Sequence, residues 1–281
     1  MAADRLRAKI LRIAREAGAE AVAVAYHDWE TRTEWSLYGD VWFHAASTIK
    51  LPVMVGVYGV VAEGELGTDS RVHVRNRFRS VADGEPFRVE ASRDANSDVQ
   101  AAIGRTMKVE DLARHMIVTS SNLATNLLLD LVGVEEVQAK LASLSLHGVR
   151  LERGVEDERA FERGINNRVT AKGLLEVLRV LQERRAFSAE LSEQMLEILH
   201  GQEFNAGIPA GLPDGARVAH KTGEISTIAH DAGLVYLEGR EPYAVVILTE
   251  WPAEVTGARH ETIARISRAI FEHLCGEGED A

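Results

Sequence analysis

Two residues at the start of an apolar segment could form a nucleophile and its base. Ser47 and Lys50 stand three positions apart in the run Ser47-Thr48-Ile49-Lys50. Residues i and i+3 of a helix share a face, so the Lys50 amine is expected beside the Ser47 hydroxyl. A serine hydroxyl attacks well when a neighbouring base takes its proton, and desolvation lowers the pKa of a buried lysine enough for this role. The pair therefore predicts acyl transfer through serine.

Two further motifs follow along the chain. Ser120-Ser121-Asn122 precedes a predicted helix, and Lys221-Thr222-Gly223 lies on a predicted strand. Each triplet alone also fits an ordinary solvated helix start or strand end. The order S-x-x-K, S-x-N, K-T-G, with compatible local structure at all three places, is a much stronger signal. It predicts that the three motifs meet at one site.

Hydrophobic patterning gives the elements that must position these motifs. Apolar residues at helical spacing predict a first helix that ends near Gly18, and a buried apolar helix is predicted from Ser47 onward. Strands are predicted over 21–27 and 33–38, with three more after Arg217. Further helices are predicted over 109–116, 122–131, 134–144, 171–183, 188–199 and about 257–274, with irregular structure over 70–108. This layout predicts an α/β (α+β) fold, with one antiparallel sheet flanked by helices plus a helical lobe.

The motif set is a signature of class A β-lactamases and penicillin-binding proteins. The chain resembles that superfamily of active-site serine hydrolases, and most of all its class A-like branch, the β-lactamase-2 family. The stretches FHAASTIKLPVMVGVY, MIVTSSNLATNLLLD, NNRVTAKGLLEVLRVL and HKTGEISTIAHDAGLVY carry the resemblance. It implies a β-lactamase/transpeptidase-like fold in a single catalytic domain over 1–281. Within it, an α/β lobe would span 1–68 and 205–281, and a helical lobe 69–204.

The resemblance also implies roles in the acylation step. Ser47 would be the nucleophile, and Lys50 its base partner. Ser120 would pass a proton to the leaving nitrogen. These three residues would make and resolve a covalent acyl-serine intermediate.

Five further residues are implied to bind the substrate. Asn122 would contact the substrate amide. Lys221 would supply positive charge for a substrate carboxylate and polarise Ser120, with Thr222 nearby. The oxyanion hole would be formed by the backbone N–H groups of Ser47 and of Glu224, which follows Gly223.

Three departures from the family pattern affect the expected chemistry. Ser121 stands where the family usually has Asp. Glu224 stands where a small neutral residue is common, and its carboxylate would repel the carboxylate of a penicillin unless it turns outward. The ExxLN motif that holds the deacylating glutamate of class A enzymes is absent from the stretch LERGVEDERAFERGINNRVT.

That stretch contains five acidic residues that could replace the missing glutamate. The spacing of Asp157, Ala160, Gly164, Asn167 and Thr170 resembles the pattern of the β-lactamase-2 relatives, so Asp157 is the predicted catalytic acid. A carboxylate is required only if water must be activated for fast deacylation. The other acids of the stretch are expected to be solvated surface charges: Glu152, Glu156, Glu158 and Glu162.

Composition excludes several classes of function. The 281 residues include 32 basic and 43 acidic side chains, which give a formal net charge of −11. This balance argues against a nucleic-acid partner or an anionic membrane, because a phosphate backbone requires a basic face. The single cysteine, Cys275, excludes an intramolecular disulfide and a cysteine-based zinc site. The histidines lack HxxxH or HExxH spacing, so no metal is expected, and no other cofactor is expected either.

The N-terminal stretch carries charges at nearly every turn and lacks the apolar h-region of a secretory signal. No stretch approaches the roughly 20 apolar residues that span a bilayer. We therefore expect a cytoplasmic protein, or a periplasmic or secreted one if the true start lies upstream. The sequence leaves the oligomeric state open.

Three hypotheses of function follow. The leading one is a serine hydrolase that opens a β-lactam or related amide through an acyl-Ser47 intermediate, as in β-lactam catabolism and antibiotic resistance. The second uses the same residues as an esterase or D-amino-acid peptidase, which suits a cytoplasmic chain because cytoplasm holds no cross-linked peptidoglycan. The third is a penicillin-binding or sensor domain that stays acylated, which the absent ExxLN motif favours.

Overall fold

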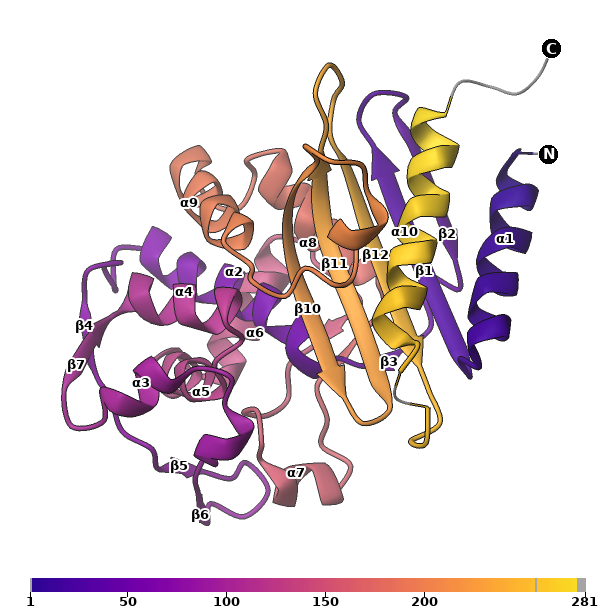
Figure 1. Ribbon diagram of the computed structural model, residues 1–281. Helices are drawn as coiled ribbons and strands as arrows, with labels where there is room; N and C mark the ends of the chain where they lie inside the picture. The colour runs from indigo at the N-terminus through magenta and orange to yellow at the C-terminus, as the bar shows by residue number, and fades with distance from the viewer. Residues whose placement is uncertain (1, 256, 277–281) are drawn as a thin grey trace.

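Five antiparallel strands form the main sheet of the computed structural model, which describes residues 2–255 and 257–276. The strands lie in the order β10-β11-β12-β1-β2 (Figure 1). Their bounds are β1 Ala21–Asp28, β2 Thr33–Leu37, β10 Arg217–Ile225, β11 Ile228–Tyr236 and β12 Tyr243–Glu250. Segments from both ends of the chain therefore build one antiparallel sheet. The predicted fold class is confirmed.

Helices cover both faces of this sheet. α1 (Ala2–Ala17) and α10 (Arg259–Cys275) lie side by side over one face (Figure 1). α8 (Ala171–Gln182) packs on the other face, against β1, β11 and β12. Because both faces are covered, β11 and β12 are buried along almost their whole length.

α2 (Lys50–Ala62) is buried on every side over most of its length, as its uniformly apolar sequence predicts. Gly56 allows the close approach of α6 (Val134–Ser143), because a Cβ atom at Gly56 would lie 2.5 Å from Cγ1 of Val137. The first turn differs from the expectation of a helix starting at Ser47. Residues Ala46–Ile49 form the 3-10 helix η1, and the α-helix begins at Lys50.

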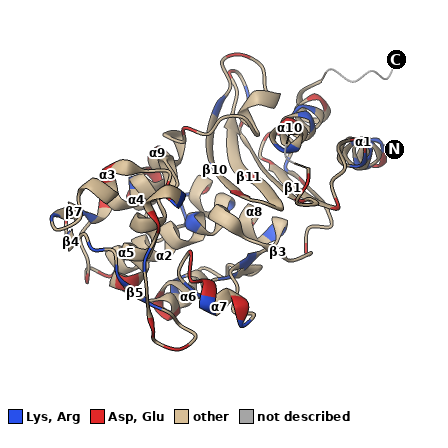
Figure 2. Cartoon of the chain, turned by 60° about the horizontal axis from the view of Figure 1, so that its bottom comes forward, with Lys and Arg blue, Asp and Glu red and all other residues tan. Residues whose placement is uncertain are grey.

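The middle of the chain is helical, as expected. Its helices are α3 Ser97–Ala101, α4 Val109–Val118, α5 Asn122–Val132, α6, α7 Glu158–Glu162, α8 and α9 Ala189–His200. In Figure 2 the charged residues lie mainly on the outer helices and loops, whereas the strands of the sheet are mostly tan.

Short elements complete the fold. Several of them lie in the segment 70–108, which was expected to be irregular. The short elements are β3 Phe43–His44, β4 Arg71–His73, β5 Phe78–Arg79, β6 Pro86–Phe87, η2 Ala91–Arg93, β7 Thr106–Lys108, β8 Val149–Arg150, β9 Arg168–Val169 and η3 Pro209–Gly211. β3, β8 and β9 pair in a small sheet that ties the segment before Ser47 to both ends of the loop 151–167. That pairing matters for the site, because the loop lies beside Ser47.

The larger hydrophobic core continues from the sheet into the helical region. Ala23 and Leu248 of the sheet belong to the same buried cluster as Leu112 of α4 and Leu127 of α5. The boundaries between the two lobes, at 68/69 and 204/205, stay a prediction. None of the described helices combines the length and the apolar character needed to cross a membrane.

Candidate active site

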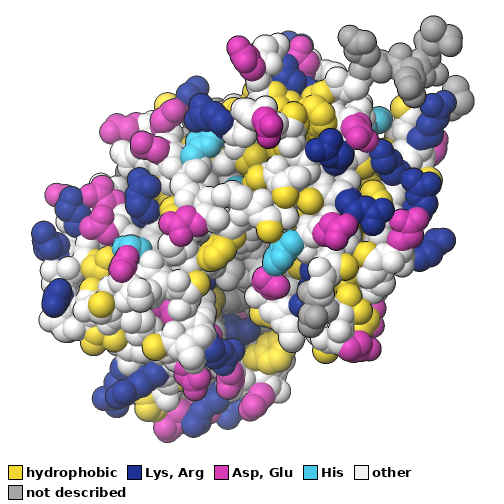
Figure 3. Space-filling model, viewed as in Figure 1, with side chains coloured by type: hydrophobic (Ala, Val, Ile, Leu, Met, Phe, Trp, Pro, Cys, Tyr) yellow, Lys and Arg dark blue, Asp and Glu magenta, His cyan; other side chains and the backbone are white. Residues whose placement is uncertain are grey.

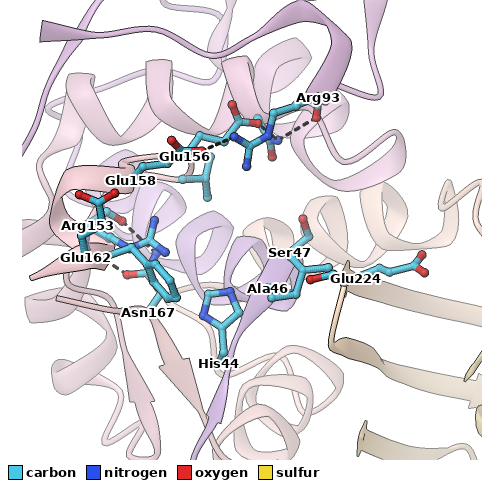
Figure 4. A pocket seen from close by; sticks show the side chains of 15 residues that line it. His44, Ala46, Ser47, Arg93, Arg153, Glu156, Glu158, Glu162, Asn167 and Glu224 are labelled. Carbon is cyan, nitrogen blue, oxygen red and sulfur yellow. Dashed lines mark hydrogen bonds and ion pairs between the residues drawn. The ribbon is translucent and has the colours of Figure 1, made fainter. Parts of the chain in front are cut away.

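A cleft of about 770 Å³ opens beside Ser47. Its lining includes His44 and Ser47 from the segment before α2, Glu156 and Phe161 from the loop 151–167, and Glu224 from β10 (Figure 4). Figure 3 shows the surface hollowed between the sheet and the helical region. Ala46, directly before Ser47, has a φ of 44°, a left-handed conformation that L-residues rarely adopt and that recurs at functional sites.

Lys50 lies at the bottom of the site and is fully buried. Its Nζ donates to the carbonyl oxygen of Ser120 at 2.7 Å, to Ser120 Oγ at 3.1 Å and to Asn122 Oδ1 at 2.7 Å. Burial, reinforced by the positive charge of Lys221, holds the pKa of Lys50 well below its ordinary value of 10.5. The structure therefore joins the first two motifs directly, through a lysine whose neutral form is accessible.

Ser120 is the point at which the three motifs meet. Lys221 Nζ donates to Ser120 Oγ at 3.1 Å, the same distance that separates Lys50 Nζ from that oxygen. Burial lowers the pKa of Lys221 from 10.5 to about 7. Ser120 has a φ of 57°, so its backbone is held in a strained conformation. One hydroxyl thus lies between two buried amines that can exchange protons with it.

Gly223 brings the third motif against the nucleophile. A Cβ atom at this position would lie 2.9 Å from the backbone nitrogen of Thr48 and 3.1 Å from that of Ser47. Only glycine allows β10 to approach η1 so closely. The approach places Glu224, the next residue on β10, on the wall of the same cleft.

Asp94 organises the second motif, although it was not among the residues predicted for the site. Its Oδ1 accepts from the backbone N–H of Asn122 at 3.0 Å, and its Oδ2 accepts from Leu123 N–H at 3.1 Å and Ser121 Oγ at 3.3 Å. Its charge also raises the pKa of Lys50, against the effect of burial. No sequence signal marks Asp94, because it lies in the irregular segment 70–108. It supplies a carboxylate beside Ser121, the position at which the resemblance implied an Asp.

Asp157 lies outside the lining of the cleft and is buried. It caps α7, since its Oδ1 accepts from Ala160 N–H at 3.2 Å. Its Oδ2 accepts from Val81 N–H at 3.0 Å. With both oxygens bound to backbone amides, this carboxylate has the environment of a structural group.

Three acids of the loop line the cleft, Glu156, Glu158 and Glu162, and of these Glu156 contacts Asn122 of the second motif. Glu156 Oε1 accepts from Asn122 Nδ2 at 2.5 Å, and it lines the cleft with Ser47. Burial raises its pKa, and its negative charge contributes to raising that of Lys50. The expectation of a solvated surface charge at Glu156 is wrong, because its side chain is partly buried and hydrogen-bonded to Asn122.

Two asparagines fix the loop that carries Glu156. Asn126 on α5 donates to Val155 O at 2.9 Å and accepts from Val155 N–H at 2.9 Å. Asn167 accepts from the N–H groups of Glu152 and Arg153 through its Oδ1, at 2.8 and 3.1 Å. The loop is therefore held at its base and directly beside the acid.

Glu224 turns away from Ser47, as Figure 4 shows. Its Oε2 lies 3.2 Å from Nε2 of His260 on α10. The hydrogen bond lowers the pKa of Glu224 and raises the pKa of His260. The outward orientation that a penicillin carboxylate would require is thus present, and the contact with His260 holds it.

Two other histidines near the site, His220 and His230, are buried and hydrogen-bonded. His220, beside Lys221, is buried with Nδ1 2.9 Å from Asp231 Oδ1. His230 is buried, and burial lowers its pKa to about 4. Nowhere in residues 2–255 and 257–276 do three or more His, Cys, Asp or Glu side chains form a group suited to a metal ion.

The chain is similar to known β-lactamases in sequence and in fold. The sequence profile of the β-lactamase enzyme family matches residues 5–274. A β-lactamase structure from Sphaerobacter thermophilus is 27% identical over 95% of both chains, with a TM-score of 0.79.

Two further structures share the fold at 22% identity. One is PBP-A, with a TM-score of 0.80 over 96% of this chain and 95% of that one. The other is a β-lactamase from Chitinophaga pinensis, with a TM-score of 0.81 over 96% and 99%. No curated protein matches the chain. Because the profile covers nearly the whole sequence, the chain belongs to the β-lactamase enzyme family.

Proposed function

We propose that the protein is a serine hydrolase that opens β-lactams or related amides through an acyl-Ser47 intermediate. The observation that carries this proposal is the position of Ser120 Oγ, 3.1 Å from both Lys50 Nζ and Lys221 Nζ. A structural serine does not require two buried amines with lowered pKa values. A proton relay does, because it must accept and release a proton within one turnover.

Acylation would begin when neutral Lys50 takes the proton of Ser47 Oγ, which attacks the substrate carbonyl carbon. The C–N bond then breaks, and the leaving nitrogen takes a proton from Ser120 Oγ. Lys50 or Lys221 returns a proton to Ser120 through the 3.1 Å contacts. The ring nitrogen ends as an amine and the carbonyl carbon as an ester of Ser47.

Deacylation requires a base for water, and we assign this role to Glu156 rather than Asp157. Glu156 lines the cleft beside Ser47 and contacts Asn122. Its pKa, raised by burial, brings the carboxylate closer to the basicity that suits general-base catalysis near neutral pH. Asp157 has both oxygens occupied by the N–H groups of Ala160 and Val81.

The similar structures support an acyl-enzyme on this fold. One of them is an L158E mutant of PBP-A described as an acyl-enzyme complex with penicillin G, and it shares 22% identity with this chain. The sensor hypothesis depends on the absence of a deacylating acid. Glu156 supplies a candidate acid, so turnover is the better supported outcome.

An intact-mass time course with penicillin G tests the proposal. The proposal predicts an adduct on Ser47 that forms and then disappears as product accumulates. A persistent adduct would favour the sensor hypothesis. Hydrolysis of simple esters without any β-lactam adduct would favour an esterase or peptidase instead.

A further inference from the structure

A second cavity of about 320 Å³ adjoins Ser47 on the leaving-group side. Ser47 and Ser120 line it together with Thr222, Glu224 and His260. In the proposed function Ser120 protonates the leaving nitrogen, so the substituents on that nitrogen must enter this cavity. Its charges therefore act on the leaving group of the substrate.

The cations of this region are already engaged. Lys221 Nζ donates to Ser120 Oγ and, at 2.9 Å, to the carbonyl oxygen of Thr222. Arg259, on α10 beside His260, donates to the carbonyl oxygens of Val255, Ile225 and Ser226. Arg93, which also lines the cavity, forms an ion pair with Glu158, a residue of the first cleft. A carboxylate on the leaving group would therefore meet the negative charge of Glu224 beside cations that already bind other partners.

His260 is the group that compensates Glu224. The Glu224–His260 pair is half exposed, with 51% and 44% of the two side chains accessible. Its other charged neighbours are Arg259 and the buried Asp231. Protonated His260 draws the carboxylate away from Ser47 and neutralises it. Neutral His260 leaves a full negative charge at the rim.

We propose that the Glu224–His260 pair selects substrates by the charge of their leaving group. When the pair is ionised, the cavity admits an anionic leaving group. When His260 is neutral, Glu224 disfavours that group, and substrates with an uncharged leaving group are preferred. This selection rests on the proposed function of Ser47, because it defines which end of the substrate enters the cavity.

Two substrate pairs test the selection. The first is penicillin G and its methyl ester, and the second is 3-acetoxybenzoate and phenyl acetate. The acyl part is the same within each pair, and the leaving-group side differs at one carboxylate, which is methylated in the first pair and absent in the second. The measured quantity is the ratio of the acylation efficiencies of the neutral and anionic members, which cancels the pH dependence of Ser47 activation.

For the wild-type protein this ratio should rise by about tenfold between pH 5.5 and pH 8.5, as His260 loses its proton. E224Q should reduce the rise to the part that comes from loss of the Lys221 proton, and H260Q should start from a higher ratio at pH 5.5 and show the same reduced rise. Glu261 is an exposed acid next to His260, and E261Q serves as a control for net charge that should behave like the wild type.

The outcomes separate the two proposals. A ratio that rises equally in E224Q overturns the selection. Acylation by the simple esters alone overturns β-lactam hydrolysis, while the ester pair still decides the role of Glu224. Failure of both pairs to acylate Ser47 contradicts both.

Discussion

Asp94 Oδ1 accepts a 3.0 Å hydrogen bond from the backbone N–H of Asn122, across a separation of 28 residues. This contact, with those to Leu123 and Ser121, fixes the start of α5 and therefore both Ser120 and Asn122. A carboxylate at a helix N-terminus also interacts favourably with the helix dipole. The second motif is thus positioned by a residue from outside it.

D94A should lower the free energy of unfolding by about 1–3 kcal/mol, because three donors at the start of α5 lose their acceptor. It should also slow acylation, since Asn122 and Ser120 lose their support. Urea unfolding and the rate of adduct formation measure the two effects. D98A removes an exposed acid four residues away and serves as the control. Equal acylation rates in D94A and D98A would show that Asp94 has no role in positioning the site.

E156Q and D157N should show which of the two loop acids acts in deacylation and which one stabilises the fold. E156Q should slow deacylation by about 10²- to 10⁴-fold, the range of a general base, so the Ser47 adduct should accumulate. D157N should leave deacylation nearly unchanged but destabilise the protein by about 1–3 kcal/mol, because the Val81 N–H loses its acceptor. Burst kinetics with mass spectrometry, together with urea unfolding, measure both variants. Adduct accumulation in D157N but not in E156Q would reverse the assignment.

S47A should lose all covalent labelling by penicillin G and by fluorophosphonate probes while keeping its fold. The Ser47 side chain lies in a 3-10 turn at the cleft and supports no core packing, so its loss should change the melting temperature little. Peptide mapping of labelled wild type and S47A, with circular dichroism as the control for folding, tests this. Labelling of S47A at any other residue would show that Ser47 is not the nucleophile.

The buried lysines should make the protein more stable as pH rises from 7 to 9. The pKa of Lys221 falls to about 7 in the folded protein, whereas the unfolded lysine keeps a value near 10.5. The unfolded chain therefore binds more protons in this window, and stability increases with pH by up to about 1.4 kcal/mol per pH unit for each such lysine. Urea unfolding of the wild type and K221M at pH 7, 8 and 9 should give a shallower slope for the variant. Identical slopes would show that Lys221 has an ordinary pKa in the folded state.

The elements of this fold could be predicted from the sequence because each depends on neighbouring residues. The strand at Ala21–Asp28, the apolar α2 helix and the helix after Ser121 each carry a local periodicity that specifies them. The three motifs were likewise visible, since each is a short run of residues. Their order along the chain predicted a shared site before any distance was known.

The tertiary structure decided which acids reach that site. Asp157 and Glu156 are adjacent in sequence, yet one caps α7 and the other contacts Asn122. Asn126 anchors the loop at Val155, directly before these two acids, and Glu156 has a left-handed backbone with a φ of 61°. Asp94 contacts Ser121, and His260 contacts Glu224. In both cases the partners come from distant segments that only the packing of the chain brings together. Short motifs and periodicities are local and can be recognised in the sequence, whereas contacts between distant segments depend on how the whole chain packs.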